Sequence, residues 1–225
     1  MTVRGRTSVA RRAGGPLKLA LAMGAMYDDE LDLLRRAGVD ISALQEESRS
    51  LVFDLNGLTA ITVRPSDVPT YVEAGAADLG ITGKDILLEQ SDRSVYELAD
   101  LGIGPCRMVL AGREGDNSLD ESARRLGVMR IASKYPEVAG RYFEETGRQA
   151  EIIEVKGSVE LAPLVGLADG IVDLVATGRT LRENGLEVRE EIFESTARLV
   201  ANRVSHKVRA EAVDEFAARL SEASR

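Results

Sequence analysis

The residues best suited to chemistry lie between positions 171 and 186, which read I-V-D-L-V-A-T-G-R-T-L-R-E-N-G-L. An apolar run with Asp173 inside it turns into a helix-like segment through Ala176, Thr177, Gly178, Arg179 and Thr180. Small, hydroxylated and glycine residues after a strand present backbone N–H groups and threonine hydroxyls to an anion. Asp173 can accept hydrogen bonds from sugar hydroxyls or hold a metal-bound diphosphate. The chemistry indicates a phosphosugar loop, although many α/β proteins have such a turn without a ligand.

A second strand–turn–helix follows the start of the chain. Residues 17–21 alternate as a strand, Met23-Gly24-Ala25 forms a turn, and residues 27–37 have the apolar spacing of a helix that ends at Gly38. The beginning of such a helix is a second candidate anion site. Asp28, Asp29 and Glu30 suit the helix dipole there but would compete with a phosphate.

Composition narrows the class of protein. The 225 residues suffice for one large or two small domains, and 44% hydrophobic with 29% charged residues is typical of a globular protein. The net charge of −8 argues against a nucleic-acid partner. A bound phosphate must therefore be held by local cations and backbone dipoles.

The cysteine and histidine counts exclude several kinds of site. A single cysteine, Cys106, allows neither an internal disulfide nor a cysteine-based zinc site. A Ser-His-Asp triad would have to use His206, which stands in a polar stretch and is more typical of a surface or packing residue. We predict no metal site made by the protein alone.

The N-terminus resembles an export signal, because Arg11 and Arg12 precede a short apolar run. That run contains Lys18 and continues directly into an amphipathic segment. We therefore predict a disordered basic tail over residues 1–14. No apolar stretch approaches the ~20 residues of a membrane span, and the sequence favours a cytoplasmic protein without a membrane partner.

Strands and helices alternate along the rest of the chain, which predicts an α/β protein with mostly parallel sheets. One series ends near the strand at 106–112, and a fresh series follows. A strand at 192–201 can return to the first unit, and a C-terminal helix is predicted over 207–223. We therefore predict two lobes joined by two crossings with a ligand cleft between them. Lobe I comprises 15–106 plus 192–225, and lobe II, with the candidate loop, comprises 107–191.

Four stretches taken together resemble one family. Residues 64–73 read R-P-S-D-V-P-T-Y-V-E and residues 75–85 read G-A-A-D-L-G-I-T-G-K-D. Residues 157–169 read G-S-V-E-L-A-P-L-V-G-L-A-D, and residues 173–181 read D-L-V-A-T-G-R-T-L with N-G-L at 184–186. This combination is similar to the catalytic chain of the ATP phosphoribosyltransferases, from about Leu17 to about Lys207. The length fits the short form, which lacks the C-terminal regulatory domain of the long form.

The resemblance implies a fold, a reaction and partners. The fold is like that of type II periplasmic binding proteins. In the reaction, N1 of ATP displaces pyrophosphate from C1 of phosphoribosyl pyrophosphate with Mg²⁺, the first step of histidine biosynthesis. The implied assembly is a homodimer within a hetero-octamer that includes a histidyl-tRNA-synthetase-like regulatory subunit.

The same resemblance implies roles for individual residues. The phosphoribosyl pyrophosphate site comprises Asp173, Ala176, Thr177, Gly178, Arg179 and Thr180, in which loop N–H groups take the 5′-phosphate and Asp173 takes the ribose hydroxyls. Glu160 matches the glutamate of the G-S-V-E-L-A-P motif near the sugar. Arg64 and Arg49 match arginines that face ATP or diphosphate charges, together with the turn at Gly24. The implied catalytic residues are Arg49, Arg64 and Glu160.

One turn departs from the pattern. The family usually reads L-P-K-G-R-L where this chain reads L-A-M-G-A-M at residues 21–26, so Met23 and Ala25 replace a lysine and an arginine. Each lost charge-assisted hydrogen bond is worth roughly 1.5–3 kcal/mol. Either other cations such as Lys18, Lys84, Arg49 and Arg107 compensate, or activity is reduced.

Two alternatives to the transferase stay open on sequence alone. One is a catalytically impaired nucleotide or phosphosugar sensor on the same scaffold, with Met23 and Ala25 as its marks. The other is a solute-binding protein, favoured by the signal-like N-terminus but not by the phosphoribosyl loop.

Overall fold

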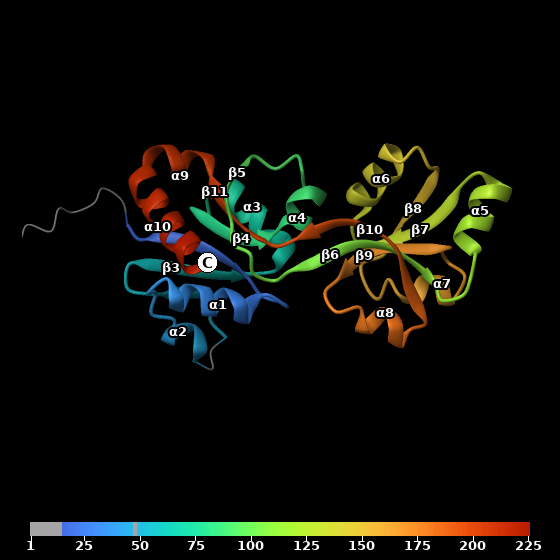
Figure 1. Ribbon diagram of the computed structural model, residues 1–225. Coiled ribbons are helices and arrows are strands. Elements are labelled where there is room, and N and C mark those ends of the chain that lie inside the picture. The colour runs from blue at the N-terminus through green and yellow to red at the C-terminus, as the bar shows by residue number, and fades with distance from the viewer. Residues whose placement is uncertain (1–14, 47–48) are drawn as a thin grey trace, which may run out of the picture.

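Alternating strands and helices produce two separate sheets, each the centre of one lobe (Figure 1). The computed structural model describes residues 15–46 and 49–225. The predicted tail at 1–14 lies outside these residues. Among the described residues, no helix has the length and apolar character needed to cross a bilayer.

The sheet of lobe I has the strand order β2-β3-β1-β4-β11-β5. Its strands are β1 (Leu17–Ala22), β2 (Val52–Asp54), β3 (Leu58–Val63), β4 (Leu79–Gly83), β5 (Val95–Asp100) and β11 (Ala197–Asn202). β1 pairs in parallel with β3 and β4, whereas β2, β5 and β11 run antiparallel to their neighbours. The carboxyl ends of β3, β1 and β4 therefore share one edge.

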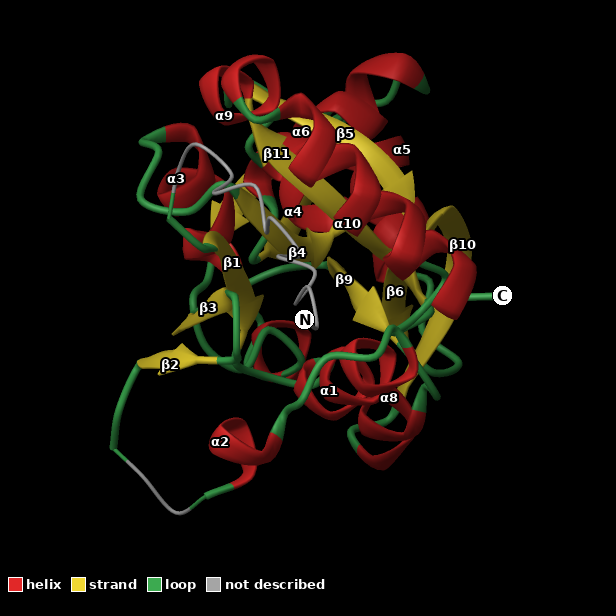
Figure 2. Ribbon diagram, turned by 90° about the vertical axis from the view of Figure 1, so that its left-hand side faces the viewer, coloured by secondary structure: helices red, strands yellow, loops and turns green. Residues whose placement is uncertain are grey.

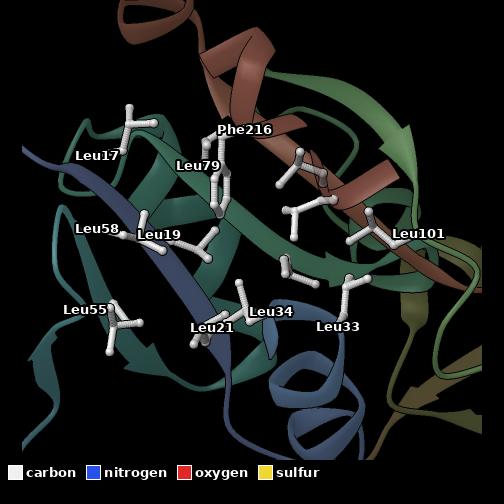
Figure 3. Packing of buried hydrophobic residues seen from close by; sticks show 14 of the residues in the cluster. Leu17, Leu19, Leu21, Leu33, Leu34, Leu55, Leu58, Leu79, Leu101 and Phe216 are labelled. Atoms are coloured by element: carbon white, nitrogen blue, oxygen red, sulfur yellow. The ribbon is translucent and has the colours of Figure 1, made fainter. Parts of the chain in front are cut away.

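Helices cover both faces of this sheet (Figure 2). They are α1 (Tyr27–Arg36), α2 (Ser42–Gln45), the 3₁₀ turn η1 (Pro65–Asp67), α3 (Val68–Glu73), α4 (Lys84–Glu89), α9 (Arg203–Val208) and α10 (Ala210–Ala223). Leu33 and Leu34 of α1 and Phe216 of α10 pack on Leu19 and Leu79 of the sheet (Figure 3). Val68 and Val72 of α3 pack on the other face. Alternate strand residues thus supply the cores on both sides.

The sheet of lobe II has the order β10-β6-β9-β7-β8. Its strands are β6 (Cys106–Arg113), β7 (Met129–Ser133), β8 (Ala150–Glu154), β9 (Gly170–Val175) and β10 (Leu186–Ser195). Its helices are α5 (Ser118–Leu126), α6 (Pro136–Glu145), α7 (Leu161–Leu164) and α8 (Arg179–Glu183). Phe143 of α6 packs on one face of the sheet, and Leu181 of α8 packs on the other.

The carboxyl edges of the two sheets face the boundary between the lobes. The chain crosses from β5 to β6 and returns from β10 to β11 with only Thr196 between those two strands. Gly83, at the end of β4, pairs with Ala197, the first residue after the return. Val175, at the end of β9, pairs with Arg107 beside the first crossing. Loops that follow β1, β3 and β4 therefore lie on the side of lobe I that faces the loops after β7 and β9.

The crossing differs from the prediction of one strand over 192–201. Residues up to Ser195 pair with β6, and residues from Ala197 pair with β4 and β5. The predicted lobe limit between 191 and 192 thus falls inside β10. Alternating hydrophobicity continues across Thr196, so the sequence pattern alone does not mark the change of sheet.

A buried carboxyl group supports the turn after β1. Glu30 of α1 is fully buried, and its carboxyl oxygens accept the backbone N–H of Ala22 at 3.0 and 3.4 Å. The L-P-K-G-R-L pattern given above has a proline where this chain has Ala22, and proline has no backbone N–H that needs an acceptor. Here Ala22 exposes a donor in the core, and Glu30 provides its acceptor. Burial, opposed by that hydrogen bond, raises the pKa of Glu30 well above 4.5.

We expect Glu30→Gln to stabilise the protein increasingly as the pH rises. Because its pKa is raised on folding, Glu30 stabilises the fold below its unfolded pKa and loses that contribution as the pH rises toward its folded pKa. Glutamine does not titrate, so the variant's advantage in unfolding free energy grows by up to about 1.4 kcal/mol per pH unit above about pH 4.5. Urea unfolding at several pH values measures it, with exposed Glu144→Gln of α6 as control. An advantage independent of pH would contradict the assignment.

Candidate active site

The loop at residues 176–180 follows the buried end of β9. Thr177 is exposed, and Gly178 adopts a left-handed φ of 71° before α8 begins. The backbone N–H groups of Thr177 and Gly178 have no acceptor among the described residues. The Arg179 guanidinium is occupied by Glu183 at 2.6 Å, so the side chain of Arg179 is drawn along its own helix. The loop therefore offers an anion free backbone donors rather than a free guanidinium.

Asp173 lies just before this loop with 7% of its surface exposed. Its Oδ1 accepts the N–H of Leu174 at 2.9 Å, and its Oδ2 is 3.7 Å from Nζ of Lys134. Burial raises the pKa of Asp173 above 3.8, Lys134 opposes that rise, and the nearby charge of Glu160 adds to it. The structure thus brings Glu160, Asp173 and the loop together at one edge of lobe II.

Lys134 reaches Asp173 because β7 and β9 are parallel neighbours. The buried Ser133 hydroxyl donates to the carbonyl of Val172 at 2.6 Å and accepts the N–H of Tyr135 at 2.9 Å. These two bonds fix the chain direction after β7. Lys134 was not predicted from the sequence to lie beside Asp173. Its position directly after a parallel strand was the available signal.

The other predicted residues lie on lobe I. The N–H of Met23 donates to the carbonyl of Val63 at 2.7 Å, which holds the turn at 23–25 beside the end of β3. A Cβ at Gly24 would lie 3.4 Å from Pro65. The carbonyl of Leu51 accepts the N–H of Thr62, so the chain before β2 runs antiparallel to the end of β3. This places Gly24, Arg64 and Arg49 around one region at the carboxyl edge of the sheet.

The positive charges predicted to face the polyphosphates are unequally available on the two lobes. Lys84 is paired with Glu97 at 2.7 Å, and Arg107 is paired with Glu191. By contrast, Arg49 and Arg64 are exposed and have no ion pair among the residues that the structure describes. Of the cations expected to compensate for Met23 and Ala25, Lys84 and Arg107 are paired, whereas Arg49, like Arg64, has no ion pair within the described part of the chain that would compete with a polyphosphate.

A polar network links the lobes beside the site. Asp85 of α4 donates its N–H to Oγ of Ser195 at 3.1 Å, and the Ser195 hydroxyl donates back to Oδ1 of Asp85 at 2.9 Å. Burial raises the pKa of Asp85, while Ser195 and Tyr135 of lobe II oppose that rise. The Glu89 carboxylate accepts the N–H groups of residues 137 and 138 at the start of α6. The contact between α4 and α6 thus fixes one side of the lobe boundary.

Two cavities of the described chain lie within single lobes. One of about 400 Å³ lies on lobe II and includes Thr177, Gly178 and Arg182. Another of about 900 Å³ lies on lobe I between the start of β1 and α10, away from the carboxyl edge. The small cavity adjoins the loop at residues 176–180, and the larger one has none of the predicted site residues.

Comparison with known proteins supports one family. The family model described as HisG, ATP phosphoribosyltransferase, matches residues 64–222. An ATP phosphoribosyltransferase of Rubrobacter xylanophilus is 55% identical over 86% of this chain and 89% of its own length. One from Bacillus licheniformis is 47% identical over 92% and 95%.

Solved structures agree on the fold. The chain resembles one from the ATP phosphoribosyl transferase (HisG:HisZ) complex of Thermotoga maritima, with 40% identity, a TM-score of 0.77, and coverage of 92% of this chain and 98% of that one. The periplasmic aliphatic sulphonate binding protein SsuA of Escherichia coli, 12% identical, has a TM-score of 0.62 over 94% of this chain and 73% of its own. The predicted type II binding-protein architecture is confirmed. The chain belongs to the ATP phosphoribosyltransferase family, the pentosyltransferases of the first step of histidine biosynthesis.

Proposed function

We propose that the chain joins N1 of ATP to C1 of phosphoribosyl pyrophosphate between the two carboxyl edges. The single observation that carries this proposal is the loop at 176–180, whose N–H groups at Thr177 and Gly178 have no acceptor in the described chain and lie beside a buried carboxylate. Lobe II holds the phosphoribosyl group, and the arginines of lobe I face the polyphosphates. Holding both substrates in line supplies much of the rate enhancement, because displacement at C1 needs positioning and charge neutralisation.

Each residue has a distinct task in this proposal. The N–H groups of Thr177 and Gly178, with the Thr177 and Thr180 hydroxyls, take the 5′-phosphate. Asp173 accepts hydrogen bonds from the ribose hydroxyls, and Glu160 stabilises positive charge that develops at the sugar. Arg49 and Arg64 neutralise the diphosphate as it leaves. Within residues 15–46 and 49–225, these backbone donors have no acceptor and the two guanidinium groups have no ion pair, which supports these roles.

Mg²⁺ enters this proposal with the substrates. No group of three or more His, Cys, Asp or Glu side chains in the described chain is arranged to hold a metal ion. Asp173 and Glu160 are two neighbouring carboxyl groups. This donor set fits Mg²⁺, which commonly keeps several waters and binds through one or two carboxylates plus phosphate oxygens. The ion would supply charge neutralisation of the diphosphate.

The activity is tested by mixing the chain with ATP, phosphoribosyl pyrophosphate and Mg²⁺ and following phosphoribosyl-ATP by its ultraviolet absorbance. The assay is run with and without a histidyl-tRNA-synthetase-like subunit. We expect turnover in at least one condition. Tight phosphoribosyl pyrophosphate binding without turnover in either condition would instead identify the sensor alternative.

We expect Gly178→Ala to weaken phosphoribosyl pyrophosphate binding more than its effect on folding explains. At a φ of 71°, a side chain costs about 1–2 kcal/mol, and the new Cβ would lie 3.0 Å from Nη1 of Arg182. Either the Arg182 side chain moves away from the carbonyl of Thr177 or the strained backbone relaxes, and both change the loop. KM for phosphoribosyl pyrophosphate should therefore rise roughly tenfold or more through weakened phosphate hydrogen bonds. Gly185→Ala is the matched control, because it has a φ of 63° and open space around the Cβ. Equal KM values for both variants would remove the loop from the phosphate site.

We also propose a histidyl-tRNA-synthetase-like regulatory partner and a homodimer within a hetero-octamer. The similarity to a chain from a HisG:HisZ complex supports the partner. Exposed apolar side chains around α7, namely Leu161, Leu164, Val165 and Leu167, provide a surface of the kind that protein contacts cover. Because ATP and phosphoribosyl pyrophosphate are cytoplasmic metabolites, we place the protein in the cytoplasm. Sedimentation with and without the partner tests the assembly.

A further inference from the structure

Helix α4 belongs to lobe I in sequence, but its side chains are anchored in both lobes. Leu87 packs with α3 against a buried cluster of lobe I. Leu88, the next residue, packs against the buried cluster of lobe II that includes Phe143. At the start of the helix, the N–H of Lys84 donates to the carbonyl of Thr196 at 3.0 Å, on the return between the lobes. α4 therefore contacts both lobes at once.

Helix α6 of lobe II begins without a cap from its own lobe. Its first residue, Pro136, has no N–H, and the side chain of Tyr135 before it makes no cap hydrogen bond within the described part of the chain. The N–H groups of Glu137 and Val138 donate to the two carboxyl oxygens of Glu89 at 3.2 and 3.0 Å. A carboxylate of lobe I thus satisfies the orphan donors of a lobe II helix, at the end that the helix dipole makes attractive to negative charge.

Two further hydrogen bonds extend this contact. The Arg141 guanidinium, one turn further along α6, donates to the carbonyl of Leu88. On the lobe I side, the side-chain amide of Gln90 donates to the carbonyl of Ser66 at 2.8 Å, two residues after Arg64. The end of α4 is therefore bonded both to lobe II and to the segment that carries a polyphosphate-facing arginine.

Glu89 lies on a continuous path of contacts between the two substrate edges. At the lobe II end of this path, α6 begins two residues after Lys134, whose Nζ is 3.7 Å from Oδ2 of Asp173. We propose that Glu89 is a positioning residue, which holds the two lobes in the orientation that aligns ATP with phosphoribosyl pyrophosphate. This inference rests on the proposed transfer between the two carboxyl edges. Glu89 acts through α6 and is not required to touch either substrate.

Binding and reaction depend differently on the orientation of the lobes. In the proposed function, the phosphoribosyl group is held by lobe II, so phosphoribosyl pyrophosphate can bind while the lobes are misaligned. Displacement at C1 needs both substrates in line, and a misplacement of about 1 Å can cost on the order of a hundredfold in rate. Loss of Glu89 should therefore lower kcat far more than it weakens substrate binding.

The test compares the wild type, Glu89→Gln and Glu89→Ala in the assay condition in which the wild type turns over. For the alanine variant, we expect kcat to fall about tenfold or more and the Kd of phosphoribosyl pyrophosphate with Mg²⁺, measured by calorimetry, to change less than about threefold. Glutamine keeps one acceptor oxygen for one of the two N–H groups, so it should retain more of kcat than alanine. Glu144→Ala, which removes an exposed glutamate of α6, is the matched control and should leave kcat unchanged.

Hydrogen–deuterium exchange provides a readout that is independent of activity. The amide groups at residues 137 and 138 should exchange faster in Glu89→Ala than in the wild type, because their acceptor is gone. Faster exchange there with an unchanged kcat would overturn the inference. Equal losses in kcat and in affinity would also overturn it, because Glu89 would then only stabilise the fold of lobe II. If the wild type binds phosphoribosyl pyrophosphate but never turns over, the proposed function fails, and the inference fails with it.

Arg141→Met keeps the inference testable if Glu89→Ala does not fold. It removes the other hydrogen bond between α6 and α4 and leaves Glu89 in place. We expect the same pattern, a lower kcat with a nearly constant Kd. Arg125→Met, which removes an exposed arginine of α5 in the same lobe, controls for the loss of one positive charge. A wild-type kcat in both Arg141→Met and Glu89→Gln would contradict the inference, with thermal unfolding used to confirm that each variant is folded.

Discussion

Replacing Asp173 by asparagine is expected to lower kcat/KM for phosphoribosyl pyrophosphate by roughly two to four orders of magnitude and to leave the fold at least as stable. Hydrogen bonds to a charged group are worth about 1.5–3 kcal/mol each, and two ribose hydroxyls are available. Each 1.36 kcal/mol is tenfold in rate. The size of the loss follows from those two bonds.

The stability part of this prediction follows from the raised pKa of Asp173. Because the folded pKa is above the unfolded one, Asp173 stabilises the fold at low pH and loses that contribution as the pH rises. Asparagine does not titrate, so the variant should gain on the wild type as the pH rises above the unfolded pKa of about 4 toward the raised folded pKa. Kinetics and thermal unfolding on the same samples test both parts. A variant that loses activity and stability together would make Asp173 a structural residue.

Asp169→Asn is an informative control because Asp169 is also a buried carboxylate on lobe II. Its carboxylate accepts the N–H of Arg130 and pairs with that guanidinium at 2.8 Å, and these bonds lower its pKa. The unfolding free energy of this variant should therefore fall behind that of the wild type as the pH rises through the acid range. Its activity should be kept wherever the protein is folded. The two substitutions should thus change stability in opposite directions as the pH rises. That difference distinguishes a carboxyl group of a ligand site from one in a structural ion pair.

The sequence predicted the site more fully on lobe II than on lobe I. Asp173, Glu160 and the loop at 176–180 lie close together because β9 and its neighbours deliver them to one edge, and local motifs carry that information. Lys134 and Asp85 were not predicted as site neighbours, because parallel pairing and the return at Thr196 place them there. Such contacts depend on which strands are adjacent, and a single sequence does not encode that order in a local pattern. The burial of Glu30 likewise depends on α1 packing over β1.

The turn at 23–25 provides the second large effect. Met23→Lys combined with Ala25→Arg is expected to raise kcat/KM by up to about two to four orders of magnitude, if polyphosphate charges are neutralised there by two new hydrogen-bonded cations. Met23 is 51% exposed, and its N–H is fixed to Val63, so both new side chains start from a defined turn beside Arg64. The fold should tolerate them because both positions are exposed.

If the two new charges act by direct contact with the polyphosphate, their effect on kcat/KM must depend on where they are placed. Val204→Lys with Val208→Arg adds the same charges at exposed positions of α9 on the same lobe, 65% and 72% exposed. We expect this control to change kcat/KM little, because surface charges separated from the site by more than about 10 Å are largely screened at 0.1 M salt. Equal gains from both pairs would mean that net charge, and not the turn, limits the rate. No gain from either would mean that Arg49 and Arg64 already neutralise the diphosphate. In that case, removing Arg64 should cost more here than in a relative that keeps the lysine and arginine.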